Sequence, residues 1–246
     1  MLSFETVLSC ETIGLVKATS MRARLRAEMT DEIKAIARRH LASEGANLSL
    51  RAVARDLGVV SSAIYRYFPS RDDLLTALII DAYDALGTAV ESADASVADR
   101  DDLRGRWLAC SHAVRGWALA HPAEYALVFG TPVIGYAAPP DTTLAAIRTP
   151  GTLVGILAHG VATGSLAPPA KSLALPDDLA ADLDRVRMEF WPTVPADLLV
   201  LGTIGWIHLF GAVSFELFGQ LNNAIDAREA YFDVQMRLMA DLIGLR

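Results

Sequence analysis

The chain of 246 residues has only two cysteines, Cys10 and Cys110, too few for a disulfide framework or a cysteine-rich metal site. Its five histidines are scattered, and it has no HExxH, CxxC or GxSxG motif and no glycine-rich loop after a strand. It also lacks alternating polar and apolar residues over a strand-length segment. These absences argue against an enzyme. We expect no catalytic residue, no cofactor and no metal site, in a reduced cytoplasmic setting.

The N-terminal segment has little that is typical of a signal peptide. It lacks a basic region, and Glu5 and Glu11 interrupt its apolar residues. Met21 precedes the basic run RARLRAEM, so starts at Met1 and at Met21 both fit the sequence. We expect residues 1–21 to be a flexible extension.

Charged residues are absent from one strongly apolar run, residues 198–215, over eighteen positions. That length is the threshold for considering a membrane helix. Three glycines within the run, His208 near its middle and no flanking basic residue favour a helix buried in the core and between subunits. The 52 % hydrophobic composition favours the same reading, since it exceeds what an average soluble monomer needs. A membrane span is the alternative.

The most informative segment that is present is LSLRAVARDLGVVSSAIYRYFPSRDDLL, residues 48–75. Ser49 can cap a helix whose apolar residues recur at i, i+3, i+4 and i+7 from Leu50. Gly58 lies where a left-handed residue ends a helix. The segment therefore predicts a short helix followed by a tight glycine turn.

A second short helix should follow, capped by Ser61 or Ser62, with Ile64 and Phe68 pointing inward. Ser70 is then expected to cap a long helix that starts at the next residue. Two short helices joined in this way are typical of a helix-turn-helix, whose second helix enters the major groove of DNA. A plain helical hairpin with solvated arginines is the alternative.

Charge is segregated along the chain. Residues 22–71 hold ten arginines and lysines against five acidic residues, a net charge of +5, whereas residues 72–246 hold eleven against twenty-two, a net charge of −11. A helix over about 28–43 would complete a three-helix head within the basic block. A local basic field suits DNA although the whole protein is acidic. We expect a DNA-binding domain over 22–71 and a second domain over 72–246 that binds something else.

The stretch LRAVARDLGVVSSAIYRYFPSRDDLL resembles the N-terminal signature of the TetR (tetracycline repressor) family of transcriptional regulators. The resemblance implies an all-α fold, with an N-terminal three-helix DNA-binding domain and a larger helical C-terminal domain for ligand binding and dimerisation. Val60 stands where typical members have serine, Tyr67 where many have histidine, and Arg71 where lysine is commoner. Residues 205–219, GWIHLFGAVSFELFG, also resemble the C-terminal domain called WHG, found in part of that family.

The resemblance assigns DNA contacts to two sets of residues, and for each residue a solvated side chain is the alternative. The residues expected to hold phosphates are Ser49, Tyr65, Tyr67 and Arg71. Those expected nearest the base edges are Ser61, Ser62, Ala63 and Arg66. Upstream, Arg22, Arg24 and Arg26 could form a basic arm along the DNA or a disordered tail.

The remainder of the chain is expected to be helical over about 71–93, 100–119, 122–129, 143–164 with a kink at Pro150-Gly151, 177–190, 195–219 and 226–243. An apolar cavity is the usual form of a small-molecule site, and the aromatic residues we expect to line one are Trp107, Trp117, Tyr125, Phe129 and Trp206. Filling the core is the alternative for each of them.

The resemblance further implies a homodimer built by the last two helices, a palindromic operator, and repression relieved by a small apolar effector. A DNA-binding regulator without an effector, controlled by a protein partner or by its own abundance, is the second hypothesis.

Overall fold

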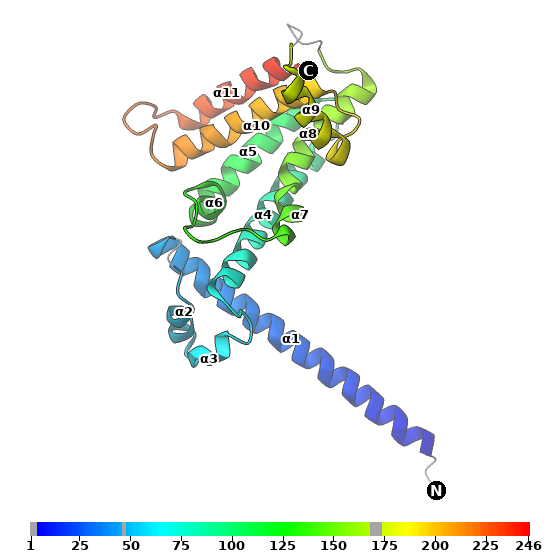
Figure 1. Cartoon of the computed structure of the whole chain (residues 1–246), viewed down its shortest axis with the longest axis vertical. Coiled ribbons are helices and arrows are strands. Elements are labelled where there is room, and N and C mark those ends of the chain that lie inside the picture. Colours follow the sequence, from blue (N-terminus) through cyan, green and yellow to red (C-terminus); the bar gives the residue numbers. More distant parts are fainter. Residues whose placement is uncertain (1–3, 46–47, 168–173) are drawn as a thin grey trace. The chain divides into compact units, whose positions relative to one another are not determined.

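The computed structural model describes residues 4–45, 48–167 and 174–246, with side chains from residue 21 onward except at position 44. Within these ranges the chain is all-α and contains no strand, which confirms the expected fold class (Figure 1). The chain divides into two compact units, Met1–Leu78 and Ile79–Arg246. Helix α4 (Arg71–Ser96) begins in the first unit and continues unbroken into the second.

The first unit contains α1 (Phe4–Glu44), α2 (Leu50–Leu57), α3 (Ser61–Ile64) and the first two turns of α4. From Ile33 to Leu78, each helix of this unit contributes buried apolar side chains: Ile33, Ile36, Ala37, Leu41, Val53, Ala54, Ile64, Phe68, Leu74, Leu75 and Leu78. This small core fixes α2 and α3 on a platform made by α1 and α4.

Helix α1 is longer than the expected helix over 28–43. Its backbone is helical from Phe4, where the sequence led us to expect a flexible extension up to residue 21. No proline and only one glycine lie between positions 4 and 28, so the sequence contains no strong helix breaker there.

The second unit contains the remainder of α4, α5 (Leu103–Ala120), α6 (Pro122–Phe129), the 3₁₀ turn η1 (Pro140–Thr142), α7 (Thr143–Ala146), α8 (Arg148–Thr163), α9 (Asp177–Phe190), α10 (Ala196–Leu217) and α11 (Arg228–Ile243) (Figure 1). Its core joins α4, α5, α8, α10 and α11, with buried members that include Leu86, Trp107, Ile156, Leu209 and Phe232. Helix α9 contributes no buried residue.

The helix expected over 143–164 is broken at Ile147 instead of at Pro150-Gly151. Pro150 is the third residue of α8, where a missing backbone N–H costs nothing because first-turn amides have no intrahelical acceptor. The proline therefore belongs to a helix start, and the predicted kink site was wrong.

Helix α10 is long and apolar enough to cross a membrane by length and composition, and the bent pair Pro140–Ala146 and Arg148–Thr163 would count as a second candidate if taken as one span. One third of the most apolar window of α10 is buried within the chain. The core helix of a soluble protein passes the same test, so this composition does not by itself identify a membrane protein.

Candidate DNA-binding surface and ligand pocket

The turn of the helix-turn-helix forms as the sequence predicts. The Ser49 hydroxyl accepts a hydrogen bond from the Ala52 N–H (3.4 Å) and caps α2. Gly58 ends that helix at φ 76°, and the Val59 N–H donates to the Ala54 carbonyl (3.0 Å). A Cβ on Gly58 would meet no atom within 4 Å. Glycine is therefore favoured here by its backbone conformation and not by crowding.

The start of the recognition helix differs from the prediction. Val60 is the N-cap of α3, with an extended backbone and no side-chain cap, and the Ala63 N–H donates to its carbonyl (2.9 Å). Ser61 is already helical, so the prediction that Ser61 or Ser62 caps the helix was wrong. Ile64 is buried as predicted, and the chain continues through a turn to Tyr67.

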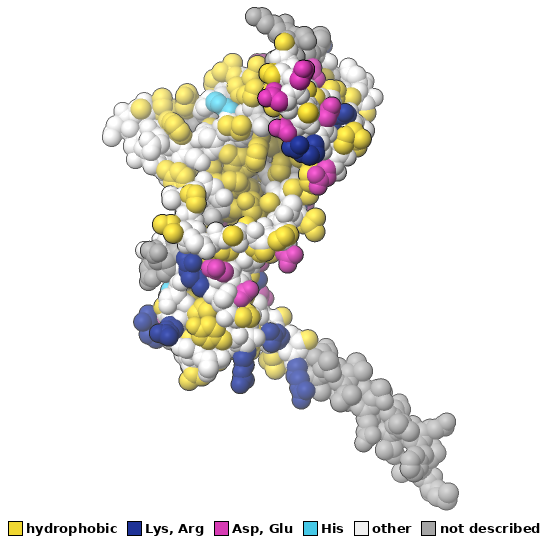
Figure 2. Space-filling view, viewed as in Figure 1, with side chains coloured by type: hydrophobic (Ala, Val, Ile, Leu, Met, Phe, Trp, Pro, Cys, Tyr) yellow, Lys and Arg dark blue, Asp and Glu magenta, His cyan; other side chains and the backbone are white. Residues whose placement is uncertain are grey.

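The predicted DNA contacts fall into two groups by exposure. Ser49, Ser62, Tyr65 and Arg66 are exposed, whereas Ser61, Ala63, Tyr67 and Arg71 are half-buried. On the face of the first unit seen in Figure 2, Lys and Arg side chains outnumber acidic ones. The exposed group belongs to residues 22–71, whose net charge of +5 makes this part of the chain locally basic.

Two of the half-buried residues also hold the first unit together. The Arg71 Nε donates to the Leu48 carbonyl (3.2 Å), which ties the start of α4 to the residues before α2. The Arg26 guanidinium lies over the ring of Tyr67, 5.1 Å from its centroid, and donates to the Arg66 carbonyl (3.0 Å). Substitution of Arg71 or Tyr67 would therefore disturb packing as well as any DNA contact.

Arg22, Arg24 and Arg26, for which the sequence left open a basic arm along the DNA or a disordered tail, all lie within α1, and their contact with DNA stays a prediction. Successive helical positions are about 100° apart, so Arg24 points to the side opposite Arg22 and Arg26, which lie one turn apart on the same side. Arg24 pairs with Glu28 at 2.8 Å, and Arg26 packs on the turn after α3.

A contact that the sequence did not indicate joins α1 to α2. The His40 Nε2 and Asp56 Oδ2 lie 2.7 Å apart, and His40 is buried. The hydrogen bond with His40 holds the pKa of Asp56 below its usual value of 3.8. Pairs between separate helices leave no spacing signal in a sequence, so only the fold could reveal this one.

The second unit contains an apolar cavity of about 260 Å³, here called the tryptophan pocket. Two of the five predicted residues, Trp107 and Trp206, line it together, whereas Trp117, Tyr125 and Phe129 do not. The other lining residues are Pro150, Leu153, Val154, Ile156, Leu157, Val186, Trp191, Leu199, Gly202, Thr203, Ile243 and Leu245.

The chemistry of this lining suits an uncharged molecule. None of its residues carries a charge, and the indole N–H of Trp107 is already donated to the Met236 carbonyl (2.9 Å). The side-chain groups of the lining that can still form a hydrogen bond with a ligand are the Thr203 hydroxyl and the indole N–H groups of Trp191 and Trp206. A charged ligand would lose its hydration here without compensation.

The three remaining aromatic candidates pack elsewhere in the second unit. The Tyr125 hydroxyl contacts the Phe210 carbonyl (3.0 Å) and the Ser214 hydroxyl (2.8 Å), and burial raises the pKa of Tyr125. Phe129 lies 4.4 Å from Phe210 between ring centroids, and Trp117 stacks on a neighbouring histidine. Their geometry is that of core packing.

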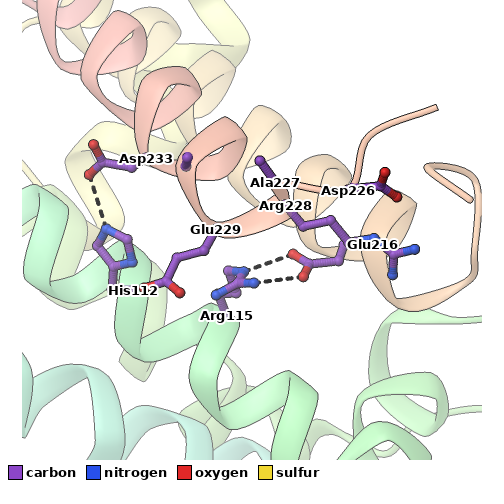
Figure 3. A pocket seen from close by; sticks show the side chains of 9 residues that line it. His112, Arg115, Glu216, Asp226, Ala227, Arg228, Glu229 and Asp233 are labelled. Atoms are coloured by element: carbon purple, nitrogen blue, oxygen red, sulfur yellow. Dashed lines mark hydrogen bonds and ion pairs between the residues drawn. The ribbon is translucent and has the colours of Figure 1, made fainter.

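A second, open groove of about 820 Å³ is polar and carries both signs of charge (Figure 3). Arg115 donates two hydrogen bonds of 2.7 Å to Glu216, which raise the pKa of the guanidinium. His112 pairs with Asp233 at 3.2 Å, and Figure 3 shows Glu229 reaching from α11 toward the same space. This groove lies where α5, α10 and α11 meet.

Of the two cysteines, only Cys110 has a side chain within the described residues. Cys10 lies where side chains are outside the described residues, and Cys110 is buried, which raises the pKa of its thiol to about 12. Among the described residues, no three His, Cys, Asp or Glu side chains are placed to hold a metal ion.

Helices α10 and α11 present exposed apolar side chains at helical spacing. The members on this face, here called the α10–α11 face, are Ile204, Ile207 and Phe215 with Tyr231, Val234 and Leu238. A shallow groove lined by Ile207, Phe215 and Tyr231, among others, joins the two rows. Neighbouring rows of exposed apolar side chains are typical of surfaces that bind a protein or a membrane.

Comparison with known proteins matches both parts of the chain. Residues 33–78 match the family described as bacterial regulatory proteins, tetR family, and residues 107–239 match the tetracyclin repressor-like C-terminal domain. The HTH-type transcriptional regulators Rv1816 of Mycobacterium tuberculosis (strain H37Rv) and Mb1846 of Mycobacterium bovis are each 39 % identical to the chain over 243 residues, covering 96 % of it and 99 % of their own length.

Solved structures share the fold. The regulatory protein SCO4313 is 34 % identical, with a TM-score of 0.72 over 89 % of this chain and 98 % of its own. A protein of unknown function from Rhodococcus sp. RHA1 has 23 % identity and a TM-score of 0.62, over 85 % of this chain and 93 % of its own. From the helix-turn-helix geometry and these matches, the chain belongs to the TetR family of transcriptional regulators.

Proposed function

We propose that this regulator is a homodimeric repressor that leaves a palindromic operator when a small apolar ligand occupies the tryptophan pocket. The uncharged lining of that pocket is the observation that carries the proposal, because it supplies a specific place for an effector. The DNA-binding domain would cover about 22–71, and the protein would act in the cytoplasm, where its DNA lies.

The exposed residues around α3 are the best candidates for reading the operator. Tyr65 offers a hydroxyl suited to a phosphate, and Arg66 a guanidinium suited to a base edge. Ser49 and Ser62 are exposed on the same unit and can donate to phosphates. Ser61, Ala63, Tyr67 and Arg71 remain proposed contacts, although each is half-buried.

The operator can be identified by selecting bound sequences from a random DNA pool. Tyr65→Phe should then weaken binding about tenfold and uniformly across sequences, because it removes one phosphate contact. Arg66→Ala should weaken binding about tenfold and relax the preference at one base pair. Arg185→Ala removes an exposed arginine of α9 as the control and should change nothing. Wild-type affinity and specificity in both variants would contradict the assigned contacts.

The size and polarity of the tryptophan pocket define a probe for the effector site. Its 260 Å³ lies just below the about 300–1,000 Å³ of sites for drug-sized ligands, so we expect a small ligand. N-phenyl-1-naphthylamine is uncharged and fluoresces in apolar surroundings, whereas 8-anilino-1-naphthalenesulfonate adds a sulfonate to the same ring system.

We expect the uncharged probe to bind at least tenfold more tightly than the sulfonate and to release the operator. Val154→Trp should fill the pocket and abolish probe binding, since Val154 lines it and is half-buried. Equal binding of both probes, or unchanged binding to the filled pocket, would instead support a regulator controlled by a protein partner or by abundance.

A further inference from the structure

Arg148, the first residue of α8, uses all five of its N–H donors on one other helix, α4. Its Nη1 donates to the backbone carbonyl (3.0 Å) and the carboxylate (2.8 Å) of Asp84. Its Nη2 donates to the Thr88 hydroxyl (3.1 Å) and to Glu91 (2.7 Å), and its Nε donates to the other oxygen of Glu91 (2.9 Å). These contacts span two turns of α4, so they fix both the height and the rotation of one helix against the other.

Close approach of the two helices reinforces this contact. A Cβ on Gly87 of α4 would lie 2.9 Å from the Cβ of Arg148. The stem of the arginine thus occupies the space above that glycine, and its guanidinium reaches residues on both sides. Sliding α8 along α4 would break several charge-assisted hydrogen bonds at once.

The same helix, α8, is a wall of the tryptophan pocket. Five of the lining residues belong to it, and the first, Pro150, follows Arg148 by two positions: Pro150, Leu153, Val154, Ile156 and Leu157. Helix α4 supplies no lining residue, yet its first two turns belong to the helix-turn-helix unit. A ligand can therefore act on α4 only through elements that touch both, and Arg148 is the most directional of these contacts.

We propose that Arg148 is a positioning residue that transmits the state of the tryptophan pocket to α4, and thereby to operator binding. The proposal rests on the proposed function of the pocket, and it identifies the contact through which the pocket would act on α4. Without the Arg148 contacts, a ligand could displace α8 without moving α4, and operator affinity would not change.

A side chain introduced into the pocket tests the link without a ligand. A Cβ on Gly202 of α10 would lie 2.7 Å from the Cδ1 of Leu157 on α8, so Gly202→Leu presses α10 against the pocket wall. Gly155→Leu is the matched control, because Gly155 lies on α8 itself and a Cβ there meets no atom within 4 Å. Operator affinity is measured by fluorescence anisotropy for each variant with Arg148 intact and with Arg148→Met.

With Arg148 intact, Gly202→Leu should weaken operator binding at least tenfold. In the Arg148→Met background, the same substitution should change it less than twofold, and Gly155→Leu should change it less than twofold in both backgrounds. Such non-additivity reports coupling, which a merely stabilising arginine would not produce. Glu91→Ala removes the acceptor from the α4 side at a half-exposed position and should reproduce the loss of coupling. If Arg148→Met does not fold, Glu91→Ala replaces it in the cycle with Gly202→Leu.

Equal effects of Gly202→Leu in both backgrounds, or no effect in either, would overturn the role of Arg148. Release of the operator by N-phenyl-1-naphthylamine separates this outcome from the proposed function. If the probe releases the operator equally from the wild type and from Arg148→Met, the pocket regulates but Arg148 does not transmit. If the probe fails on the wild type while the Gly202 cycle is non-additive, Arg148 transmits and the proposed ligand class is wrong.

Discussion

Glu216 is a buried acid near the end of α10, and its carboxylate accepts two hydrogen bonds from Arg115 of α5. Removing one member of a buried ion pair leaves the other charge uncompensated. We expect Glu216→Leu to lower the free energy of unfolding by about 2–3 kcal/mol, less than the 3–5 of a fully enclosed pair because the groove beside it is open.

Urea denaturation measures this loss. The double variant Arg115→Leu with Glu216→Leu should recover most of the lost stability, since no unpaired charge remains. A single variant as stable as the wild type would show that water in the groove already solvates Arg115.

Asp94, at the end of α4, receives hydrogen bonds from Arg106 (2.8 Å) and from Arg100. Burial raises the pKa of this carboxyl, but the two guanidinium groups outweigh burial, and the pKa lies below its usual 3.8. A lowered pKa contributes stability that is complete above the unfolded value and is lost as the pH falls through the folded one.

We therefore expect Asp94→Asn to be less stable than the wild type at pH 6, with a difference that shrinks as the pH falls below about 4. Urea unfolding at several pH values between 6 and 3 measures this difference. A gap that stays constant over that range would mean that the ionisation of Asp94 does not stabilise the fold.

At the scale of elements, comparing Gly58 with Gly116 tests whether backbone strain, and not crowding, is the reason for a glycine at the end of α2. Neither would bring a Cβ within 4 Å of another atom, but Gly58 has a φ of 76° and Gly116 lies within α5. We expect Gly58→Ala to cost about 1 kcal/mol, because a left-handed residue other than glycine is strained. Gly116→Ala should instead stabilise α5 by about 0.5–1 kcal/mol. Thermal unfolding of the two variants measures these changes. Melting temperatures that shift in the same direction in both variants would contradict this account.

Local signals located some elements well and others poorly. The cap at Ser49, the turn at Gly58 and the Ser70 cap, with the Asp73 N–H donating to it at 3.1 Å, are formed by residues close in sequence. The N-cap at Val60 and the break at Ile147 have no such side-chain signature, because packing of the flanking helices decides where the chain bends. The sequence therefore located α2 and the glycine turn correctly, but it started the second helix one or two residues late and extended it to Phe68, whereas α3 ends at Ile64.

At the scale of the whole molecule, the α10–α11 face predicts the oligomeric state. Val234 and Leu238 are more than half exposed, and burial of such a row against a second copy would complete a four-helix bundle. Val234→Glu with Leu238→Glu should give a monomer in sedimentation velocity and abolish tight operator binding, since a palindrome engages two linked recognition helices. Met188→Glu, at an exposed apolar position on α9, is the control and should leave the sedimentation coefficient unchanged. A dimer that survives the double substitution would place the interface elsewhere.

The sequence by itself determined the class of protein and the identity of its DNA-binding segment. Caps, turn and apolar spacing over residues 48–75 act between neighbours along the chain, so they can be read without a fold. Tertiary structure alone decided which aromatic residues line a cavity. Trp107 and Trp206 face the tryptophan pocket, while Tyr125 fills the core, and nothing in local spacing distinguishes them. It also decided that Arg148 meets α4, because that contact joins residues about sixty positions apart, which only packing brings together.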